Sequence, residues 1–283
     1  MSASNRAGLL NKTFKVLKKH YKPVAPPADR PVLEHLMYAC CLQNSPCEQV
    51  DEVLAKLQEN FFDWNEVRVT TVAELAELMS GLSDANESAT RLKRTLHSVF
   101  ETFYSFDLEF LRKQNLGKSV KDLESFNGTT PFTVSYLTQN ALGGHSIPVS
   151  RGSLAALQVL GVINDTEVRA WRVPGLERAI PKNKGVEFGS LLHQLGVDFG
   201  DAPFAPRVRT ILVEIDPEAK ERLPKKRTAK KDAKPEQKPK TASSKKKSAP
   251  TARSEKPNVV QKADAAAKKK KSSTKRLSRK KPR

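Results

Sequence analysis

The sequence of 283 residues predicts an all-α body followed by a disordered C-terminal tail. Apolar residues recur at helical spacing from Pro31 onward, and short loops separate the apolar segments. No stretch alternates between apolar and polar residues for long enough to predict a strand, apart from the short β-leaning segment TILVEI at 210–215. The net charge of +19 is carried by the last part of the chain, which lacks aromatic residues.

The N-terminal segment, residues 1–30, is predicted to be a basic helix followed by a proline-rich linker. Residues 5–20 interleave apolar residues with lysines in an amphipathic pattern, and the prolines of PVAPPADRP end it. The apolar positions are Leu9, Leu10, Phe14, Val16 and Leu17, and the lysines are Lys12, Lys15, Lys18 and Lys19. Residues 1–30 have seven basic side chains and one acidic, a net charge of +6.

The folded body is predicted to comprise residues 31–145 and 146–215. The family resemblance described below implies that these are a first and a second lobe, with the N-terminal helix belonging to the second. Helical periodicity is clear in four successive segments of the first lobe. These are Leu33, Leu36, Met37 and Cys40; Val50, Val53, Leu54, Leu57 and Phe61; Val72, Leu75, Leu78 and Met79; and Leu92, Leu96, Val99, Phe100 and Phe103. Residues 31–220 carry a net charge of −7.

A turn in the first lobe indicates a helix–hairpin–helix. The segment SVKDLESF is predicted to be a short helix, and Asn127–Gly128 a tight turn. Thr130 is suited to the N-cap of the next helix and Pro131 to its first position. Such a hairpin presents backbone amides at a helix N-terminus, where they suit a phosphate. A short glycine turn between two packed helices is the structural alternative.

The C-terminal tail, residues 216–283, is predicted to be disordered and to bind DNA without reading its sequence. Residues 221–283 hold 25 Lys/Arg and five acidic residues, a net charge of +20, with too little apolar surface to offset the entropy of ordering. Its composition resembles the tails of linker histones, which bind polyanions by counterion release. A solubilising tail is the alternative. The basic clusters expected to contact DNA are Lys225, Lys226 and Arg227; Lys245, Lys246 and Lys247; and Lys268, Lys269, Lys270 and Lys271.

The apolar pattern and the cysteines indicate the cellular compartment. No run of about 18 apolar residues is present, and the N-terminus lacks the apolar region of a secretory signal, so we expect a cytoplasmic, nucleoid-associated protein without a membrane partner. The cysteines Cys40, Cys41 and Cys47 lie in one stretch and are expected to be small buried hydrophobes in a reducing compartment, with redox chemistry of the vicinal pair as the alternative. No metal site is expected.

The segment LESFNGTTPFTVSYL resembles the helix–hairpin–helix of endonuclease III-like DNA glycosylases, whose pattern is LExLPGVGxKTAxxxL. Four further segments resemble the family in the same order: CCLQNSPC, SGLSDANESATRLKRTL, HSIPVSRGSLAALQVLGVI and VEFGSLLHQLG. The resemblance spans roughly residues 31–205 and implies a two-lobed helical fold that binds DNA. It places Gln43 where the family has a glutamine that fills the duplex, and Asn127, Gly128, Thr129 and Thr130 in the DNA-binding hairpin.

The departures from the family pattern predict loss of its chemistry. The position of the lysine nucleophile is Phe132, which cannot form a Schiff base, and the position of the catalytic aspartate is Ser150, which has no carboxylate. Thr130 replaces the second hairpin glycine and is expected to suit a positive φ poorly. GVDFGDAPFAPRVRTILVEI contains none of the four cysteines of cluster-bearing members, so no iron–sulfur cluster and no other cofactor is expected. Phe132 is expected to plug the cleft in part, so that Phe132→Lys costs little stability.

Three classes of function remain open from the sequence. The favoured one is a DNA-binding, repair-accessory or nucleoid-associated protein without catalysis. The second is a divergent glycosylase or abasic-site lyase in base-excision repair, using a relocated carboxylate among Glu187, Asp198 and Asp201 or tail lysines. The third is a scaffold in which the acidic body binds a protein partner. His145 and His193 are expected to be satisfied core or surface histidines.

Overall fold

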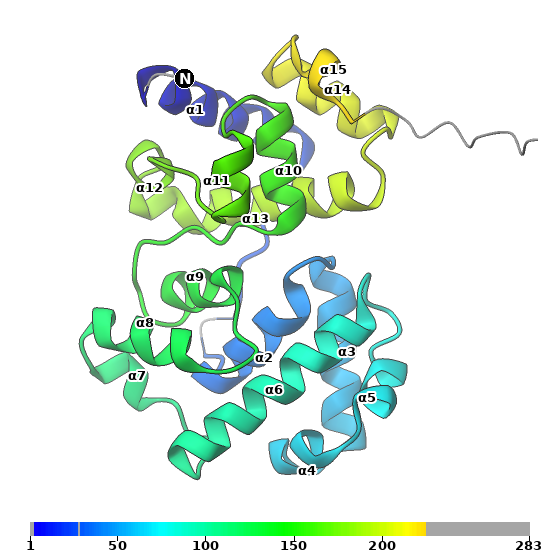
Figure 1. Cartoon of the computed structure of the whole chain (residues 1–283), viewed down its shortest axis with the longest axis vertical. Helices are drawn as coiled ribbons and strands as arrows, with labels where there is room; N and C mark the ends of the chain where they lie inside the picture. Colours follow the sequence, from blue (N-terminus) through cyan, green and yellow to red (C-terminus); the bar gives the residue numbers. More distant parts are fainter. Residues whose placement is uncertain (1–2, 28, 225–283) are drawn as a thin grey trace, which may run out of the picture. The chain divides into compact units, whose positions relative to one another are not determined.

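A computed structural model describes residues 3–27 and 29–224, all of which belong to one compact unit. These residues form fifteen α-helices and no strand, so the predicted all-α class is confirmed for the part of the chain described (Figure 1). None of these helices is long and apolar enough to cross a membrane.

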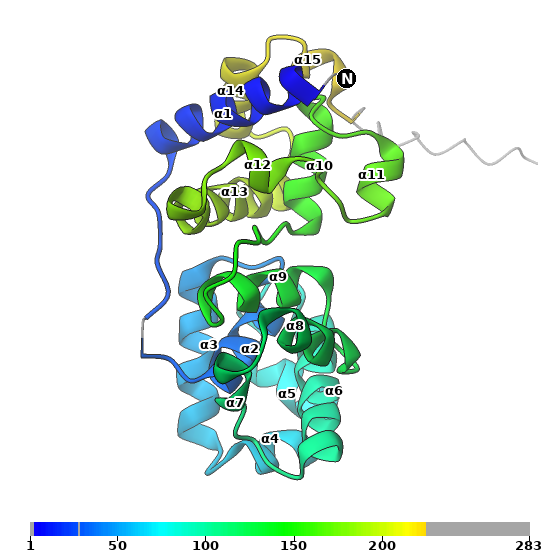
Figure 2. The same ribbon diagram turned by 90° about the vertical axis from the view of Figure 1, so that its left-hand side faces the viewer.

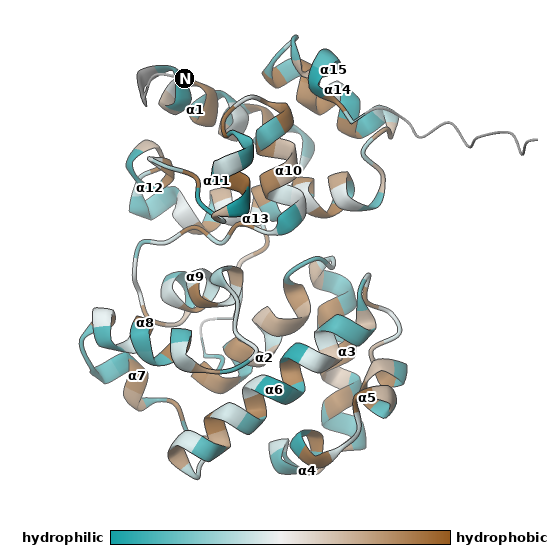
Figure 3. Cartoon of the chain, in the orientation of Figure 1, coloured by the Kyte–Doolittle hydropathy of each residue, from teal (hydrophilic) through white to brown (hydrophobic). Residues whose placement is uncertain are grey.

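The first lobe contains α2 to α9 around one buried apolar cluster that extends from Val32 to Ala141. The amphipathic helix α6 alternates hydrophilic and hydrophobic residues along its length (Figure 3), and its buried residues include Leu92, Leu96 and Val99. The helices are α2 (Val32–Leu42), α3 (Cys47–Asn60), α4 (Trp64–Val69), α5 (Val72–Leu78), α6 (Ala85–Phe103), α7 (Phe110–Lys113), α8 (Leu116–Ser125) and α9 (Pro131–Asn140).

The second lobe surrounds a separate apolar cluster built from the N-terminal helix and the C-terminal half of the body. Its members are α1 (Ala3–His20), α10 (Arg151–Val159), α11 (Asp165–Arg169), α12 (Leu176–Ala179), α13 (Lys182–Asp201), α14 (Pro206–Ile215) and α15 (Ala219–Arg222). The most extensive helix pair is α10 with α13. They cross at Gly152 and Gly196, where a Cβ on Gly152 would lie 2.0 Å from the Gly196 carbonyl oxygen. Glycine is therefore required at this crossing.

The N-terminal helix α1 lies beside α14, and a linker then runs from it to α2 in the first lobe (Figure 2). Phe14 packs edge-to-face on Phe188 of α13 with ring centroids 5.4 Å apart. Tyr21 donates its hydroxyl to Asp198 at 2.7 Å. The Val24 amide donates to Ser190 Oγ at 2.8 Å, and Gln194 Nε2 donates to Lys22 O at 2.8 Å, which holds the linker against α13.

Two predictions about the end of the body are wrong. The segment 210–215 belongs to helix α14, because Val208, Ile211, Leu212 and Ile215 all lie on one helical face that is buried in the second core. The tail was expected to begin at 216, but the described chain continues in α15, where Ala219 is fully buried in the same core. Arg222 also pairs with Asp216 at 2.7 Å, which fixes this last helix.

Candidate functional site

The hairpin between α8 and α9 forms as the sequence predicts. Gly128 has φ +108°, which glycine alone adopts readily. A Cβ on Gly128 would lie 2.7 to 2.9 Å from atoms of Thr95 and Arg91, so the turn is pressed against α6. The Asn127 amide donates to Ser98 Oγ at 3.0 Å, and the Thr129 amide donates to Phe126 O at 3.3 Å. Two hairpin amides are thus hydrogen bonded within the protein.

Thr130 does not carry the backbone strain expected of it. Its φ is −124°, and it is the N-cap of α9, with its side chain accepting the Thr133 amide at 3.2 Å. Its hydroxyl donates to Gln43 Oε1 at 2.8 Å. Gln43 is only 6% exposed, so the side chain expected to enter a duplex is buried against the hairpin.

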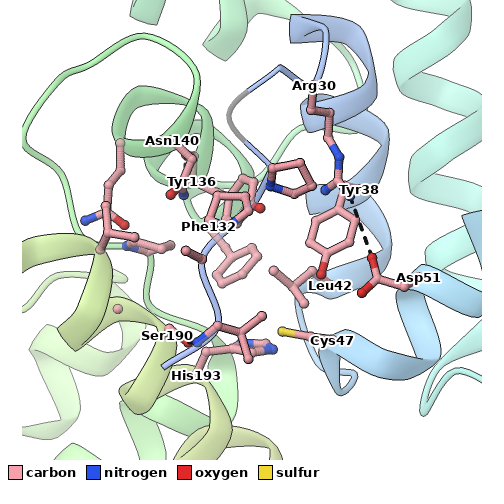
Figure 4. Close-up of a pocket in the computed structure, with 18 residues that line it drawn as sticks. Arg30, Tyr38, Leu42, Cys47, Asp51, Phe132, Tyr136, Asn140, Ser190 and His193 are labelled. Carbon is pink, nitrogen blue, oxygen red and sulfur yellow. Dashed lines mark hydrogen bonds and ion pairs between the residues drawn. The ribbon is translucent and has the colours of Figure 1, made fainter. Parts of the chain in front are cut away.

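Phe132 lies at the second position of α9 and is 1% exposed, more buried than the partial plug expected. Its ring stacks on Tyr136 with centroids 6.3 Å apart and approaches the His193 ring at 5.8 Å (Figure 4). Tyr136 belongs to the first lobe and His193 to α13 of the second, so Phe132 fills the space where the lobes meet. A lysine there would lose this packing, which overturns the expectation of a small cost.

Ser150 is a buried helix N-cap and does not line the cavity beside Phe132. It is the N-cap of α10, accepts the Ser153 amide at 3.2 Å, and hydrogen bonds the Ser153 hydroxyl at 2.9 Å. Ser153 in turn donates to Leu192 O on α13 at 3.1 Å. The Ser150 hydroxyl is therefore committed to packing α10 on α13. It is not among the residues that line the cavity beside Phe132.

That cavity has a volume of about 200 Å³ and lies between α2, α3, α9, α13 and the linker after α1. Tyr38, Phe132 and Tyr136 supply its aromatic walls (Figure 4). Arg30 lies over the Tyr38 ring, 4.2 Å from its centroid, and Arg30 Nη2 is 3.6 Å from Asp51 Oδ1. The cavity is an aromatic site with one cation and one carboxylate.

Burial controls the protonation of the groups in this cavity. It raises the pKa of the hydroxyls of Tyr38 and Tyr136 and of the Cys47 thiol. The two tyrosine hydroxyls and the Cys47 thiol are therefore neutral at pH 7. The Asp51 side chain is 57% exposed, and partial desolvation raises the pKa of its carboxyl. None of the lining residues is a lysine. The cavity offers a carboxylate but no amine that could attack a sugar aldehyde.

Sequence reasoning missed both Arg30 and Asp51. The available signal for Asp51 was its spacing from Cys47, because residues four apart lie on one face of a helix. Nothing in the spacing of the linker indicated that Arg30 would reach α2 and α3.

The carboxylates expected as substitutes lie elsewhere. Glu187 pairs with Lys18 at 2.7 Å, and Asp198 accepts the Tyr21 hydroxyl, so both hold α1 and its linker on the second lobe. Asp201 lines a separate depression with Arg151 and Asp84. None of these three carboxylates lines the cavity beside Phe132.

His145 and His193, two of the five histidines, both contact backbone carbonyl oxygens. His193 is 4% exposed and its Nε2 lies 3.0 Å from Ser45 O in the first lobe, while burial lowers its pKa. His145 Nε2 lies 2.9 Å from Glu177 O and 3.0 Å from Ile180 O. Within the described residues, Nδ1 of each ring has no hydrogen-bond partner. Each histidine is thus satisfied at one nitrogen.

Two of the three cysteines are buried, as expected. Cys40 and Cys41 are fully buried and Cys47 is half-buried at the cavity. Burial raises the pKa of the Cys40 thiol to about 11 and raises that of Cys41 as well. These thiols are protonated at pH 7 and are poor nucleophiles.

Metal donors do not gather in the described part of the chain, where no group of three or more His, Cys, Asp or Glu side chains could hold an ion. The segment after α13 contains no cysteine, so its donors do not fit an iron–sulfur cluster. The predicted tail contacts lie outside the described residues; they are Lys225, Lys226, Arg227, Lys245, Lys246, Lys247, Lys268, Lys269, Lys270 and Lys271.

No protein-family model matches the sequence, and a comparison with curated proteins finds no significant match. Solved structures do share the fold. A thermostable thymine-DNA glycosylase matches with a TM-score of 0.54 and 16% identity over 78% of this chain and 100% of that one. Endonuclease III in a trapped covalent DNA intermediate matches with a TM-score of 0.52 and 15% identity over 79% of this chain and 100% of that one. A non-covalent endonuclease III–DNA complex matches with a TM-score of 0.53 and 16% identity over 78% of this chain and 98% of that one.

These matches define the class of architecture: the body of this chain has an endonuclease III-like fold. The resemblance drawn from the sequence is thereby confirmed at the level of fold.

Proposed function

We propose that this chain is a DNA-binding protein of endonuclease III-like fold that does not excise bases. The observation that carries the proposal is Phe132. Where the sequence resemblance expects a lysine nucleophile, the chain has an aromatic ring that is 1% exposed and packed between Tyr136 and His193. Ser150, at the aspartate position, has no carboxylate and is used as a helix cap. The fold is retained while both reacting groups are absent.

The proposal assigns most of the DNA affinity to the basic segment that follows the body. Residues 221–283 carry a net charge of +20, whereas residues 31–220 carry −7. Lysines that neutralise phosphates release counterions, and this contribution does not depend on base sequence. The protein would accordingly act on the nucleoid in the cytoplasm, as a repair-accessory or architectural factor.

The absence of catalysis is tested with the full chain and a duplex that contains one abasic site. Strand incision and borohydride-trapped adducts are measured beside binding by fluorescence anisotropy. A peptide of residues 225–283 is the matched control, because its lysines can attack an abasic aldehyde without any body. We expect equal affinity for abasic and intact duplexes, and no incision above that of the peptide. Body-dependent incision would refute the proposal.

Divergent glycosylase chemistry is the second candidate, and the cavity gives it one specific observation. Asp51 is a carboxylate with a raised pKa in an aromatic cavity next to Arg30. A carboxylate in such a place can act as a general base. If body-dependent excision of any base is found, Asp51→Asn should remove it while leaving DNA binding intact. Activity that survives Asp51→Asn would exclude Asp51.

The role of the basic segment is tested by ending the chain after Pro224, which retains α15 and both buried cores. If half of the net charge of the tail engages phosphates, the slope of log K against log salt for the full chain is on the order of −9. We expect the truncated chain to lose most of its affinity and most of this slope. A truncated chain that binds an abasic duplex tightly and in preference to intact DNA would indicate lesion recognition instead.

A further inference from the structure

The two lobes have opposite charge once α1 is assigned to its place in the fold. The first lobe, residues 31–145, holds nine basic and sixteen acidic side chains, a net charge of −7. Residues 146–220 hold nine of each and are neutral. Residues 1–30 add +6, and α1 packs against α12, α13 and α14. The second lobe with α1 and its linker is therefore basic, while the lobe that contains the hairpin is acidic.

The outer face of α1 concentrates this positive charge. No acidic residue occurs in Ala3–His20, and Leu10, Phe14 and Leu17 on the inner face are buried in the second core. Lys12, Lys15 and Lys19 follow the spacing i, i+3 and i+7, which places them in one stripe, and all three are exposed. The stripe continues at its C-terminal end to the exposed Lys22.

Some cations of this face are already neutralised. Lys18 pairs with Glu187 and Lys19 pairs with Glu214, each at 2.7 Å. Within the described residues, Lys12, Lys15 and Lys22 have no carboxylate within ion-pair distance. An unpaired surface lysine can neutralise a phosphate without giving up an existing partner, so these three are the available cations.

Arg207 of α14 extends the same face. Its Nη2 donates to His20 O at 3.1 Å, and its guanidinium lies 4.8 Å from the centroid of the Tyr21 ring. These contacts fix the arginine beside the end of α1. Its nearest carboxylate, Asp198, is at 4.0 Å, and the Arg207 side chain remains 59% exposed.

In the hairpin lobe, two of the hairpin amides and one hydroxyl are already used in hydrogen bonds within the protein. These groups are the amides of Asn127 and Thr129 and the hydroxyl of Thr130. The groove beside Asn127 contains Lys93, whose ammonium group donates to the carbonyls of Arg68 and Thr70. A duplex that approached this lobe would also meet its net charge of −7.

We propose that the body binds the phosphate backbone of duplex DNA through the outer face of α1, with Lys12, Lys15, Lys22 and Arg207, and not through the hairpin. This inference rests on the proposed function, that the chain binds DNA. Lysines act as point charges toward phosphate, so this face adds affinity that is sensitive to salt and indifferent to base sequence.

The test compares two triple charge reversals in the full chain. One variant carries Lys12→Glu, Lys15→Glu and Lys22→Glu. The matched control carries Lys113→Glu, Lys118→Glu and Lys121→Glu, three exposed lysines of the hairpin lobe. Both variants change the net charge equally and leave the tail intact. Binding to an undamaged duplex is measured from low to high salt, and circular dichroism verifies that each variant is folded.

We expect the α1 variant to lose roughly 2.7 from the magnitude of the salt slope, about 0.9 for each of three phosphate contacts, and the control to keep the wild-type slope. Equal effects of the two reversals, or a larger effect of the control, would overturn the inference. If the α1 variant fails to fold, Lys→Gln at the same positions gives the same comparison. If the wild-type chain does not bind duplex DNA at all, the proposed function itself is wrong, which is a separate outcome.

Discussion

The first lobe and the second lobe both have an apolar helical core, but their net charges have opposite signs. Each encloses one apolar cluster, and each has a glycine at a close backbone contact, Gly128 against α6 in the first lobe and Gly152 against Gly196 in the second. Their net charges differ in sign, −7 for residues 31–145 and +6 for residues 1–30 and 146–220 together. The two cores support the endonuclease III-like fold, while the two lobes differ in the sign of their net charge.

The helix–hairpin–helix of the first lobe can be explained by its structural contacts alone. The hairpin remains in place because Gly128, Thr130 and Pro131 satisfy the turn and the cap. The Asn127 and Thr129 amides and the Thr130 hydroxyl bind other protein groups, and Phe132 forms one wall of the cavity behind the hairpin. A helix–hairpin–helix can thus persist for structural reasons alone.

The largest expected effect on stability is at the glycine crossing of the second lobe. A Cβ in Gly152→Ala would lie 2.0 Å from the Gly196 carbonyl oxygen, and backbone cannot yield without separating α10 from α13. We expect a loss of more than about 3 kcal/mol in the free energy of unfolding, measured in urea.

The control for this change is Gly8→Ala in α1, where nothing lies within 4 Å of the new Cβ. It should stabilise the helix by roughly 0.5–1 kcal/mol. Gly128→Ala makes the matching test in the first lobe, because it combines a positive φ with close backbone atoms. If Gly152→Ala is neutral while Gly128→Ala is not, the two lobes do not share the same dependence on close helix packing.

The sequence predicted the helices of the first lobe well because their apolar residues follow a regular period and their ends carry recognisable caps. Thr130 with Pro131 is such a signal, and the structure places the N-cap at Thr130. The end of the body was predicted poorly. The β-branched residues in TILVEI suggested a strand, although Val208, Ile211, Leu212 and Ile215 also follow a helical period, which tertiary packing favours.

The candidate site was predicted only in part, because its walls come from segments that are distant in sequence. Spacing identified Phe132 and Ser150, but it could not indicate that Phe132 would contact His193 from the other lobe or that Ser150 would face α13. Arg30 reaches the cavity from the linker, and no local pattern encodes that contact. Residue chemistry was readable from the sequence, whereas the neighbours of each residue required the fold.

Phe132→Lys should destabilise the protein by about 3 kcal/mol, because it removes a fully buried ring from the junction of the lobes and replaces it with an amine that must be hydrated. Phe62→Lys is the matched control in the same lobe, since Phe62 is 94% exposed and should tolerate the change. Unfolding in urea gives both values.

The same variant should show no more cleavage at an abasic site than the wild-type chain, because Ser150 supplies no carboxylate and lies outside the cavity. Phe132→Lys combined with Ser150→Asp is the pair of changes that supplies both missing groups. Cleavage by the single variant above that of the wild-type chain would mean that another residue provides the base, with Asp51 of the same cavity as the candidate.

The smallest expected effect is a dependence of stability on pH that arises from one buried histidine in each lobe. Burial, with further contributions from Arg30 and Arg112, lowers the pKa of His35 in the first lobe to about 4. Burial also lowers the pKa of His193 in the second lobe. The unfolded chain binds a proton at each histidine near its ordinary pKa of about 6.5, whereas the folded chain keeps them neutral.

Stability should therefore be fully present above about pH 6.5 and should fall as the pH decreases toward the folded pKa values. Between pH 7.5 and 5.0, His35 should account for about 2 kcal/mol of the free energy of unfolding, since each pH unit below 6.5 contributes about 1.4 kcal/mol. Urea titrations across this range measure the loss, and His35→Gln should remove that part of it. His193→Gln should remove a separate part while retaining a donor for Ser45 O. A pH profile that neither substitution flattens would show that the buried histidines do not set the acid sensitivity of either lobe.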